Sequence, residues 1–102
     1  EDRAIVHQAC QQADSDKMVI THGTDTMIET ARKLSGIKSK VIVLTGAMKP
    51  EKFSDSDASF NIGVAVGAIG LLTSGVYIAM NGRVLPWNKV KRDKQTGRFV
   101  EA

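Results

Sequence analysis

Apolar residues along this chain alternate between short continuous runs and helically spaced positions. The runs at 18–20 and 41–44 are rich in β-branched residues and are typical of buried strands, whereas Met27, Ile28 and Ala31 share one helix face. Extended over the whole chain, the pattern predicts helices and strands in alternation: helices over 2–13, 26–35 and 58–73, and strands over 17–21, 40–45 and 75–80. Such alternation predicts an α/β fold in which right-handed crossovers link a parallel sheet with helices on both faces.

Two further signals describe the sheet. Asn81-Gly82 is the strongest short signal for a β-hairpin, and Pro86 restricts the strand that follows to an edge, because proline cannot donate a ladder hydrogen bond. The strand over 40–45 is apolar and should be central. We therefore expect one Rossmann- or flavodoxin-like domain over residues 1–102 that ends in a β-hairpin.

The helix expected over 58–73 has two unusual features. An apolar stripe along it predicts the face that packs on the sheet; its members are Phe60, Val64, Ile69 and Leu72. Three glycines lower its helix propensity and indicate close packing, either on the sheet or on a neighbouring chain: Gly63, Gly67 and Gly70. The link before this helix, residues 45–57, is long for a strand-to-helix loop, which favours a functional role.

The most informative segment is the polar loop between the first expected strand and the helix after it. Ligands of open α/β sheets bind at this edge. Thr26 and Glu29 have the spacing of a capping box, in which each side chain accepts a bond from the other residue's backbone N–H. If Thr26 caps the helix, then Thr24 and Asp25 are available for chemistry. His22 is expected to be structural, and Asp57 is expected to cap the later helix.

Composition excludes several classes of protein. No stretch is apolar for long enough to span a bilayer, so no membrane association is expected and the cytoplasm is the expected location. The single cysteine, Cys10, is expected to be a small buried hydrophobe, and there is no Cys/His cluster for a metal. Residues 1–82 hold eight basic and nine acidic side chains, and residues 83–102 hold six and two. We interpret this basic tail as a solvated run with two apolar anchors, Trp87 and Phe99, rather than as a nucleic-acid surface.

Four motifs in one order resemble the bacterial-type L-asparaginase/glutaminase family. The first and most specific is His22-Gly23-Thr24-Asp25-Thr26-Met27, followed by Glu29-Thr30-Ala31. The others are Leu44-Thr45-Gly46-Ala47-Met48-Lys49-Pro50, then Asp57 with Phe60-Asn61, then Val76-Tyr77-Ile78-Ala79-Met80-Asn81. Four ordered matches over roughly residues 17–82 are far more specific than one short pattern.

The resemblance implies an amidohydrolase that releases ammonia from the side-chain amide of L-asparagine, or of glutamine, by threonine-based catalysis without a cofactor. It implies that Thr24 is the second of two catalytic threonines and that Asp25 binds the substrate's α-ammonium group. It also implies a substrate-binding surface at Gly23, Thr24, Asp25, Gly46 and Ala47. The family's first catalytic threonine lies in a Thr-Gly-Gly-Thr loop, which does not occur in these 102 residues. The chain therefore resembles the later part of the family's N-terminal domain, and its ending, residues 97–102, resembles that of short single-domain members.

The catalytic lysine of the family is less certain in this sequence. Counted without gaps from Asn81, it falls on Arg92, and arginine cannot act as a neutral base. A small shift brings in a neighbouring lysine, and we take Lys91 as the expected base, with Lys89 and Lys94 as alternatives. For all of them a solvated tail is the simpler interpretation.

Two rival functions stay open at this point. The first is a non-catalytic amino-acid-binding module of the same fold, and the second is a small phosphate- or nucleotide-binding protein, which the lack of a glycine-rich phosphate loop opposes. The resemblance also implies a homo-oligomer, because the family's enzymes are oligomers and an unpaired sheet edge invites association.

Overall fold

The computed structural model describes residues 2–48 and 56–102 and contains a four-stranded sheet. Its order is β1 (Lys17–Thr21), β2 (Val41–Thr45), β3 (Gly75–Met80) and β4 (Arg83–Pro86). The first three strands are parallel and β4 is antiparallel to β3. The predicted α/β fold is confirmed, as are the central position of the apolar strand β2 and the edge position of the strand with Pro86.

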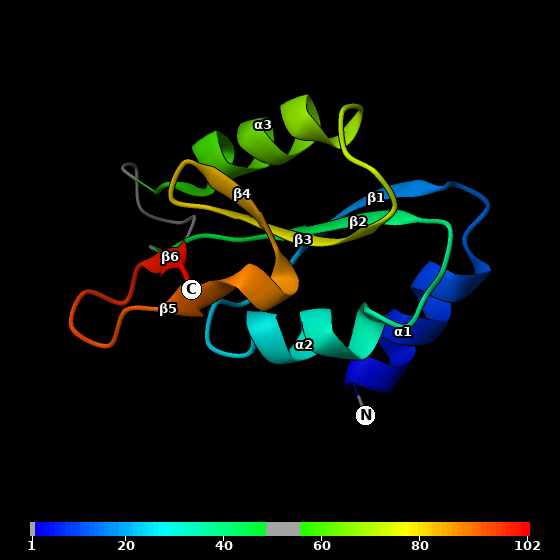
Figure 1. Ribbon diagram of the computed structural model, residues 1–102, viewed down its shortest axis with the longest axis horizontal. Helices are drawn as coiled ribbons and strands as arrows, with labels where there is room; N and C mark the ends of the chain where they lie inside the picture. The colour runs from blue at the N-terminus through cyan, green and yellow to red at the C-terminus, as the bar shows by residue number, and fades with distance from the viewer. Residues whose placement is uncertain (1, 49–55) are drawn as a thin grey trace.

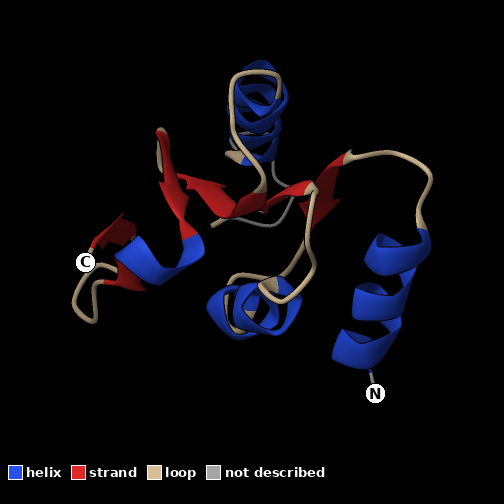
Figure 2. Ribbon diagram, turned by 45° about the vertical axis from the view of Figure 1, so that its right-hand side comes forward, coloured by secondary structure: helices blue, strands red, loops and turns tan. Residues whose placement is uncertain are grey.

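Helices cover both faces of this sheet (Figures 1 and 2). On one face lie α1 (Asp2–Gln12) and α2 (Met27–Leu34), and on the other lies α3 (Ala58–Ile69). Because side chains alternate across a strand, β2 contributes Ile42 and Leu44 to the core under α2, and Val41 and Val43 to the core under α3. Each core also takes in side chains of β3. Every residue of β2 is thus buried.

The two crossovers between the parallel strands have opposite hands. Both step in the same direction across the sheet, yet α2 and α3 lie on opposite faces, so only one of them is right-handed. The unit β1-α2-β2 is right-handed and β2-α3-β3 is left-handed (Figures 1 and 2). The expectation of right-handed crossovers throughout is therefore wrong for α3. About 98% of such connections are right-handed, so this one depends on specific contacts.

The chain after the hairpin folds as part of the domain and is not a solvated tail. It forms a 3-10 turn (η1, Trp87–Lys89) and a two-stranded antiparallel sheet of β5 (Val90–Arg92) and β6 (Phe99–Glu101). Phe99 is only 2% exposed, and its backbone N–H donates to the Asn81 side-chain oxygen at 2.7 Å. Asn81 and Gly82 both have positive φ, at 56° and 77°, which confirms the predicted hairpin turn. The same turn therefore closes one sheet and holds the second.

The outer face of α3 differs from the expectation. Of the predicted packing stripe, Val64, Ile69 and Leu72 pack against the core as expected, whereas Phe60 is 62% exposed. The buried Asn61 and Ala65 complete the face of the helix that lies on the sheet. A Cβ added to Gly63, Gly67 or Gly70 would meet no atom within 4 Å, so these glycines do not mark close packing on this sheet. The alternative, a neighbouring chain, stays a prediction.

Two smaller expectations concern α1 and the membrane. Cys10 is buried in the core under α1, as expected, and burial raises the pKa of its thiol, while the nearby Lys40 acts in the opposite direction. Among the described residues no helix is both long and apolar enough to cross a bilayer.

If β5 and β6 belong to the fold, removing the Phe99 ring should be costly. Phe99→Ala is expected to lower the free energy of unfolding by about 3–5 kcal/mol in urea titrations, because a buried aromatic ring leaves a cavity. The neighbouring Val100 is only half-buried, so Val100→Ala should cost about 1 kcal/mol. Small and equal losses in the two variants would mean that the segment is only loosely attached.

Candidate active site

The loop after β1 leaves the sheet at its C-terminal edge and is fixed first by His22. Its backbone N–H donates to the Thr45 carbonyl at 2.8 Å, which extends the pairing of β1 with β2 by one step. The ring Nδ1 lies 2.7 Å from the Gly23 carbonyl and must donate there, while Nε2 lies 2.8 Å from the hydroxyl of the buried Thr30. His22 thus ties the loop to both β2 and α2, in agreement with its expected structural role.

The predicted capping box is absent. Thr26 is the N-cap residue of α2 by position, but its side chain makes no capping hydrogen bond; the Thr30 N–H bonds instead to the Thr26 carbonyl. The Thr24 and Asp25 side chains are nevertheless available, for a different reason. His22 and Arg92 hold the backbone of the loop, and within the described part of the chain no hydrogen bond engages either side chain.

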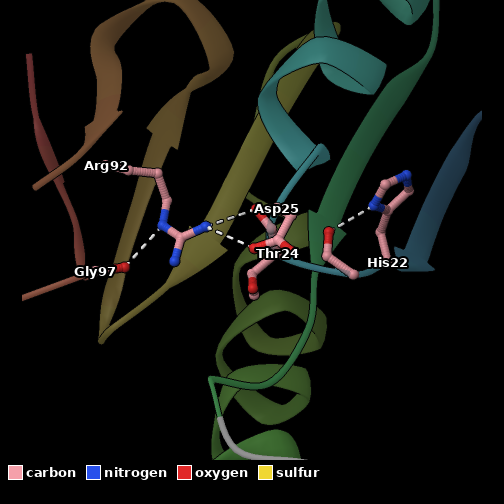
Figure 3. Close-up of polar contacts among 6 residues, drawn as sticks. His22, Thr24, Asp25, Arg92 and Gly97 are labelled. Carbon is pink, nitrogen blue, oxygen red and sulfur yellow. Dashed lines mark hydrogen bonds and ion pairs between the residues drawn. The ribbon is translucent and has the colours of Figure 1, made fainter. Parts of the chain in front are cut away.

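Arg92 is the second anchor of the loop (Figure 3). Its Nη1 donates to the Thr24 carbonyl at 2.9 Å and its Nε donates to the Gly97 carbonyl at 2.7 Å. The guanidinium also lies 4.8 Å from the centre of the Phe99 ring, a cation–π contact, and 3.8 Å from the Asp25 carboxylate. Arg92 therefore joins the second sheet to the loop that carries Thr24 and Asp25.

Gly46, at the end of β2, is a glycine for steric reasons. A Cβ there would lie 2.3 Å from the His22 carbonyl oxygen and 3.1 Å from the Met27 side chain, so any other residue would push the two loops apart. The resemblance implies a substrate-facing glycine at this position, and the structure gives close approach of two backbones as the reason for a glycine.

Asn61 fixes the other side of Gly46. This side chain of α3 is 1% exposed and donates to the Gly46 carbonyl at 2.8 Å and to the Asp57 carboxylate at 2.9 Å. The same carboxylate oxygen accepts the Met48 N–H at 3.0 Å. Asp57 is the N-cap residue of α3 by position, but it makes no capping bond with its side chain. It holds the loop after β2 instead, and this contact supports the left-handed connection.

The expected site residues line three hollows. Thr24 and Asp25 border a hollow of about 340 Å³ together with Arg92. Gly23, Gly46 and Ala47 border another, of about 390 Å³. Lys91 and Lys94 line the third, which shares Arg92 with the first but includes neither Thr24 nor Asp25. The structure thus brings Arg92, and not Lys91, to the loop; since side chains alternate along β5, the two point to opposite sides. The placement of Lys91 does not support its predicted role as the base.

Sequence analysis missed two anchors. Arg92 was considered only as a possible replacement for a base, and Asn61 only as part of a motif. Asn61 did leave a signal, since it is an amide side chain inside a mostly apolar helix and follows Asp57 by one turn. No comparable signal marks Arg92, whose partners are distant backbone carbonyls. In the described ranges, no three His, Cys, Asp or Glu side chains gather as metal ligands would.

Comparison with known proteins identifies the family. The model of the N-terminal domain of asparaginase matches residues 3–99. The chain belongs to the asparaginase family. It is 40% identical over 87 residues to L-asparaginase 2 of Escherichia coli K12, covering 80% of this chain and 25% of that protein. It is 44% identical over 72 residues to one of the subunits of the glutamyl-tRNA(Gln) amidotransferase of Methanococcus vannielii, covering 69% of this chain and 17% of that one.

A solved asparaginase has the same fold as this chain. The thermostable L-asparaginase from Thermococcus kodakarensis superposes with a TM-score of 0.84 at 29% identity, covering 98% of this chain and 33% of that one. This asparaginase-family chain spans a quarter or less of the length of the two curated relatives named in the previous paragraph.

The steric account of Gly46 predicts a specific sensitivity. Gly46→Ala should lower the free energy of unfolding by about 1–3 kcal/mol and shift the amide resonances of residues 22–25, because the His22 carbonyl must move. Gly36 offers a control, since a Cβ there meets nothing within 4 Å and its φ is not positive. Gly36→Ala should be neutral or slightly stabilising. A Gly46→Ala protein with wild-type stability and unshifted resonances would refute the close-approach account.

Proposed function

We propose that this chain forms part of an amidohydrolase that cleaves the side-chain amide of L-asparagine, with glutamine as the second candidate substrate. The observation that carries the proposal is the presentation of Thr24 and Asp25. In a member of the asparaginase family, these two side chains stand on a rigid loop at the C-terminal edge of a parallel sheet, where ligands of α/β proteins bind. Asp25 is 99% exposed and is therefore open to a ligand.

Each side chain has chemistry that suits its proposed role. The Asp25 carboxylate only accepts hydrogen bonds, so it pairs with the α-ammonium group of the substrate. The Thr24 hydroxyl is the second threonine of the reaction, and Gly23, Gly46 and Ala47 lie beside the amide. In the covalent step a threonine oxygen attacks the amide carbon, the amide nitrogen takes up the hydroxyl proton and leaves as ammonia, and water then hydrolyses the ester that remains. These 102 residues contain no Thr-Gly-Gly-Thr loop for that step, so we propose that they are the later part of an N-terminal domain.

The alternative function is a non-catalytic module that binds an amino acid. One observation favours it: the cation beside Thr24 is an arginine, which does not give up its proton at physiological pH. Lys91 stays the proposed base of a hydrolase only if another segment brings it to Thr24. The two functions can be distinguished by joining a strand that ends in Thr-Gly-Gly-Thr upstream of residue 1 and measuring ammonia release from asparagine. Release of ammonia would favour the hydrolase, and binding of asparagine without release would favour the module.

The first experiment tests ligand binding and turnover with the chain as it stands. Titration of L-asparagine into 15N-labelled protein should shift the amide resonances of Thr24, Asp25, Gly46 and Ala47, and Asp25→Asn should abolish the shifts. Glu101→Gln removes the same charge at the exposed end of β6 and should leave them unchanged. No ammonia should be released from asparagine or glutamine, because the nucleophile loop is missing. Resonances that do not respond to either amino acid would refute the proposed function. Ammonia release that Thr24→Ala abolishes would refute the prediction that this chain lacks the nucleophile.

We also propose that the protein associates with itself. The outer face of α3 carries no charge from Ala58 to Ile69 and exposes Val66 and, just beyond the helix, Leu71, which is 87% exposed. At the other side of the molecule, β1 is the end strand of the described sheet, and an apolar groove of about 380 Å³ runs between it and α1. Both surfaces suit burial against another chain.

Location in the cytoplasm stays a prediction.

Sedimentation at several concentrations tests this association. We expect a dimer or larger species whose thermal midpoint rises with concentration, because association stabilises the folded state. Val66→Lys, which places a charge on the exposed face of α3, should shift the protein toward the monomer. A folded wild-type monomer at high concentration, with a midpoint that does not depend on concentration, would contradict the proposal.

A further inference from the structure

The outer side of α3 is apolar and uncovered. Among the described helices, α3 alone lies on its face of the sheet (Figure 2). Four large apolar side chains are exposed along it: Phe60, Ile62, Val66 and, just beyond the helix, Leu71. No charged residue occurs between residues 58 and 82. A helix that is apolar on all sides is normally buried on all sides, whereas the sheet covers only one side of α3.

This outer side has the shape of a groove beside a ridge. Residues four apart form one row along a helix, and neighbouring rows lie side by side. The row of Ser59, Gly63 and Gly67 is exposed and has almost no side chain, and a Cβ added to either glycine would meet no atom within 4 Å. The next row carries Ile62 and Val66, which stand beside the glycines as an apolar ridge.

We infer that α3 binds α3 of a second copy of this chain, and that the ridge of Ile62 and Val66 in each copy packs into the groove at Gly63 and Gly67 of the other. The inference rests on the proposed self-association and adds which of its two candidate surfaces forms the interface. Packing between rows of residues four apart is the commonest helix contact, with a crossing angle of about −50°. A two-fold axis makes the contact reciprocal, because each copy supplies both a ridge and a groove.

The absence of charge favours a second copy over other occupants. A charged peptide would lose hydration at this face without gaining an ion pair. An anionic membrane attracts apolar helices that carry Lys or Arg on their other side, and residues 58–82 contain neither. The same face of a second copy is uncharged and has the matching ridge and groove.

The exposed area suits an association of moderate strength. The large side chains and the small residues between them leave on the order of 500 Å² per copy in water, so two copies would bury about 1,000 Å². This area is close to the lower limit for a specific interface. We therefore expect a dimer whose population depends on concentration.

Replacement of Gly63 by leucine distinguishes this packing from general apolar attraction. Gly63→Leu makes the outer face more apolar, so attraction by apolar surface alone would become stronger, but the added side chain fills the groove that the partner's ridge would occupy. Gly36→Leu is the matched control, because Gly36 is exposed just after α2 and a Cβ there also meets nothing within 4 Å. Ile5→Lys tests the other candidate surface, the groove between α1 and β1, and is matched to Val66→Lys, because the two residues are 64% and 58% exposed.

Dissociation constants of the dimer are measured by sedimentation of the whole chain and its variants. Gly63→Leu and Val66→Lys should each weaken the dimer by about tenfold or more, the effect of overpacking or of a buried unpaired charge. Gly36→Leu and Ile5→Lys should leave the dissociation constant unchanged. At concentrations too low for dimers, the thermal midpoint of Gly63→Leu should rise by a few degrees, because leucine favours a helix more than glycine does and the space beside Gly63 is open.

Three results would overturn the inference. The first is a Gly63→Leu dimer as tight as the wild type or tighter, or a fall in the midpoint of its monomer, which would mean that the groove is filled within one copy. The second is a dimer that Ile5→Lys dissociates and Val66→Lys does not; the protein then associates through the groove at β1, and only the assignment to α3 fails. The third is a wild type that stays a folded monomer at high concentration, in which case the proposed self-association fails together with the inference.

Discussion

The site depends on how closely β1 and β2 approach one another where both strands end. Parallel pairing continues one step past the sheet, through the bond from the His22 N–H to the Thr45 carbonyl, and brings the His22 carbonyl against Gly46. Only a residue without a Cβ fits there. The position of the loop with Thr24 and Asp25 relative to Gly46 is therefore set by backbone contacts, which do not engage the Thr24 and Asp25 side chains.

Three polar anchors hold that geometry without using the Thr24 and Asp25 side chains. The His22 ring bonds to α2, Arg92 bonds from β5 to the Thr24 carbonyl, and Asn61 bonds from α3 to the Gly46 carbonyl. Each anchor comes from a different element, so the site forms only when the whole domain is folded. The anchors also explain why a short, isolated β5–β6 sheet persists, since Arg92 and Phe99 connect it to the loop and to the core.

The sequence predicted most of the architecture, because it depends on local periodicity. Strands β1 to β3, the hairpin at Asn81-Gly82 and the edge position of Pro86 follow from apolar spacing and turn chemistry. The left-handed crossover could not be predicted, because the sequence of α3 does not indicate which face of the sheet the helix covers. The packing stripe of α3 was right for Val64, Ile69 and Leu72 and wrong for Phe60, because an almost wholly apolar helix has no polar side that marks where its buried face ends.

For the candidate site, motif matching predicted Thr24, Asp25 and Gly46, but not the contacts that hold them. The predicted capping box is absent, and the backbone of the loop is held by His22 and Arg92. Long-range bonds between a side chain and a backbone carbonyl, such as Arg92 with Thr24 across 68 positions of sequence, have no local pattern. Only a folded chain reveals that arginine, rather than lysine, stands beside the threonine.

The central claim is that contacts of His22, Gly46 and Arg92 hold a preformed loop that presents Thr24 and Asp25 to an amino acid. A crystal structure of the protein grown with L-aspartate tests it most directly. The account predicts the amino acid at the C-terminal edge of the sheet, with its ammonium group on the Asp25 carboxylate and residues 21–26 unmoved. An amino acid bound elsewhere, or a loop that has released the bonds of His22 and Arg92, would contradict it.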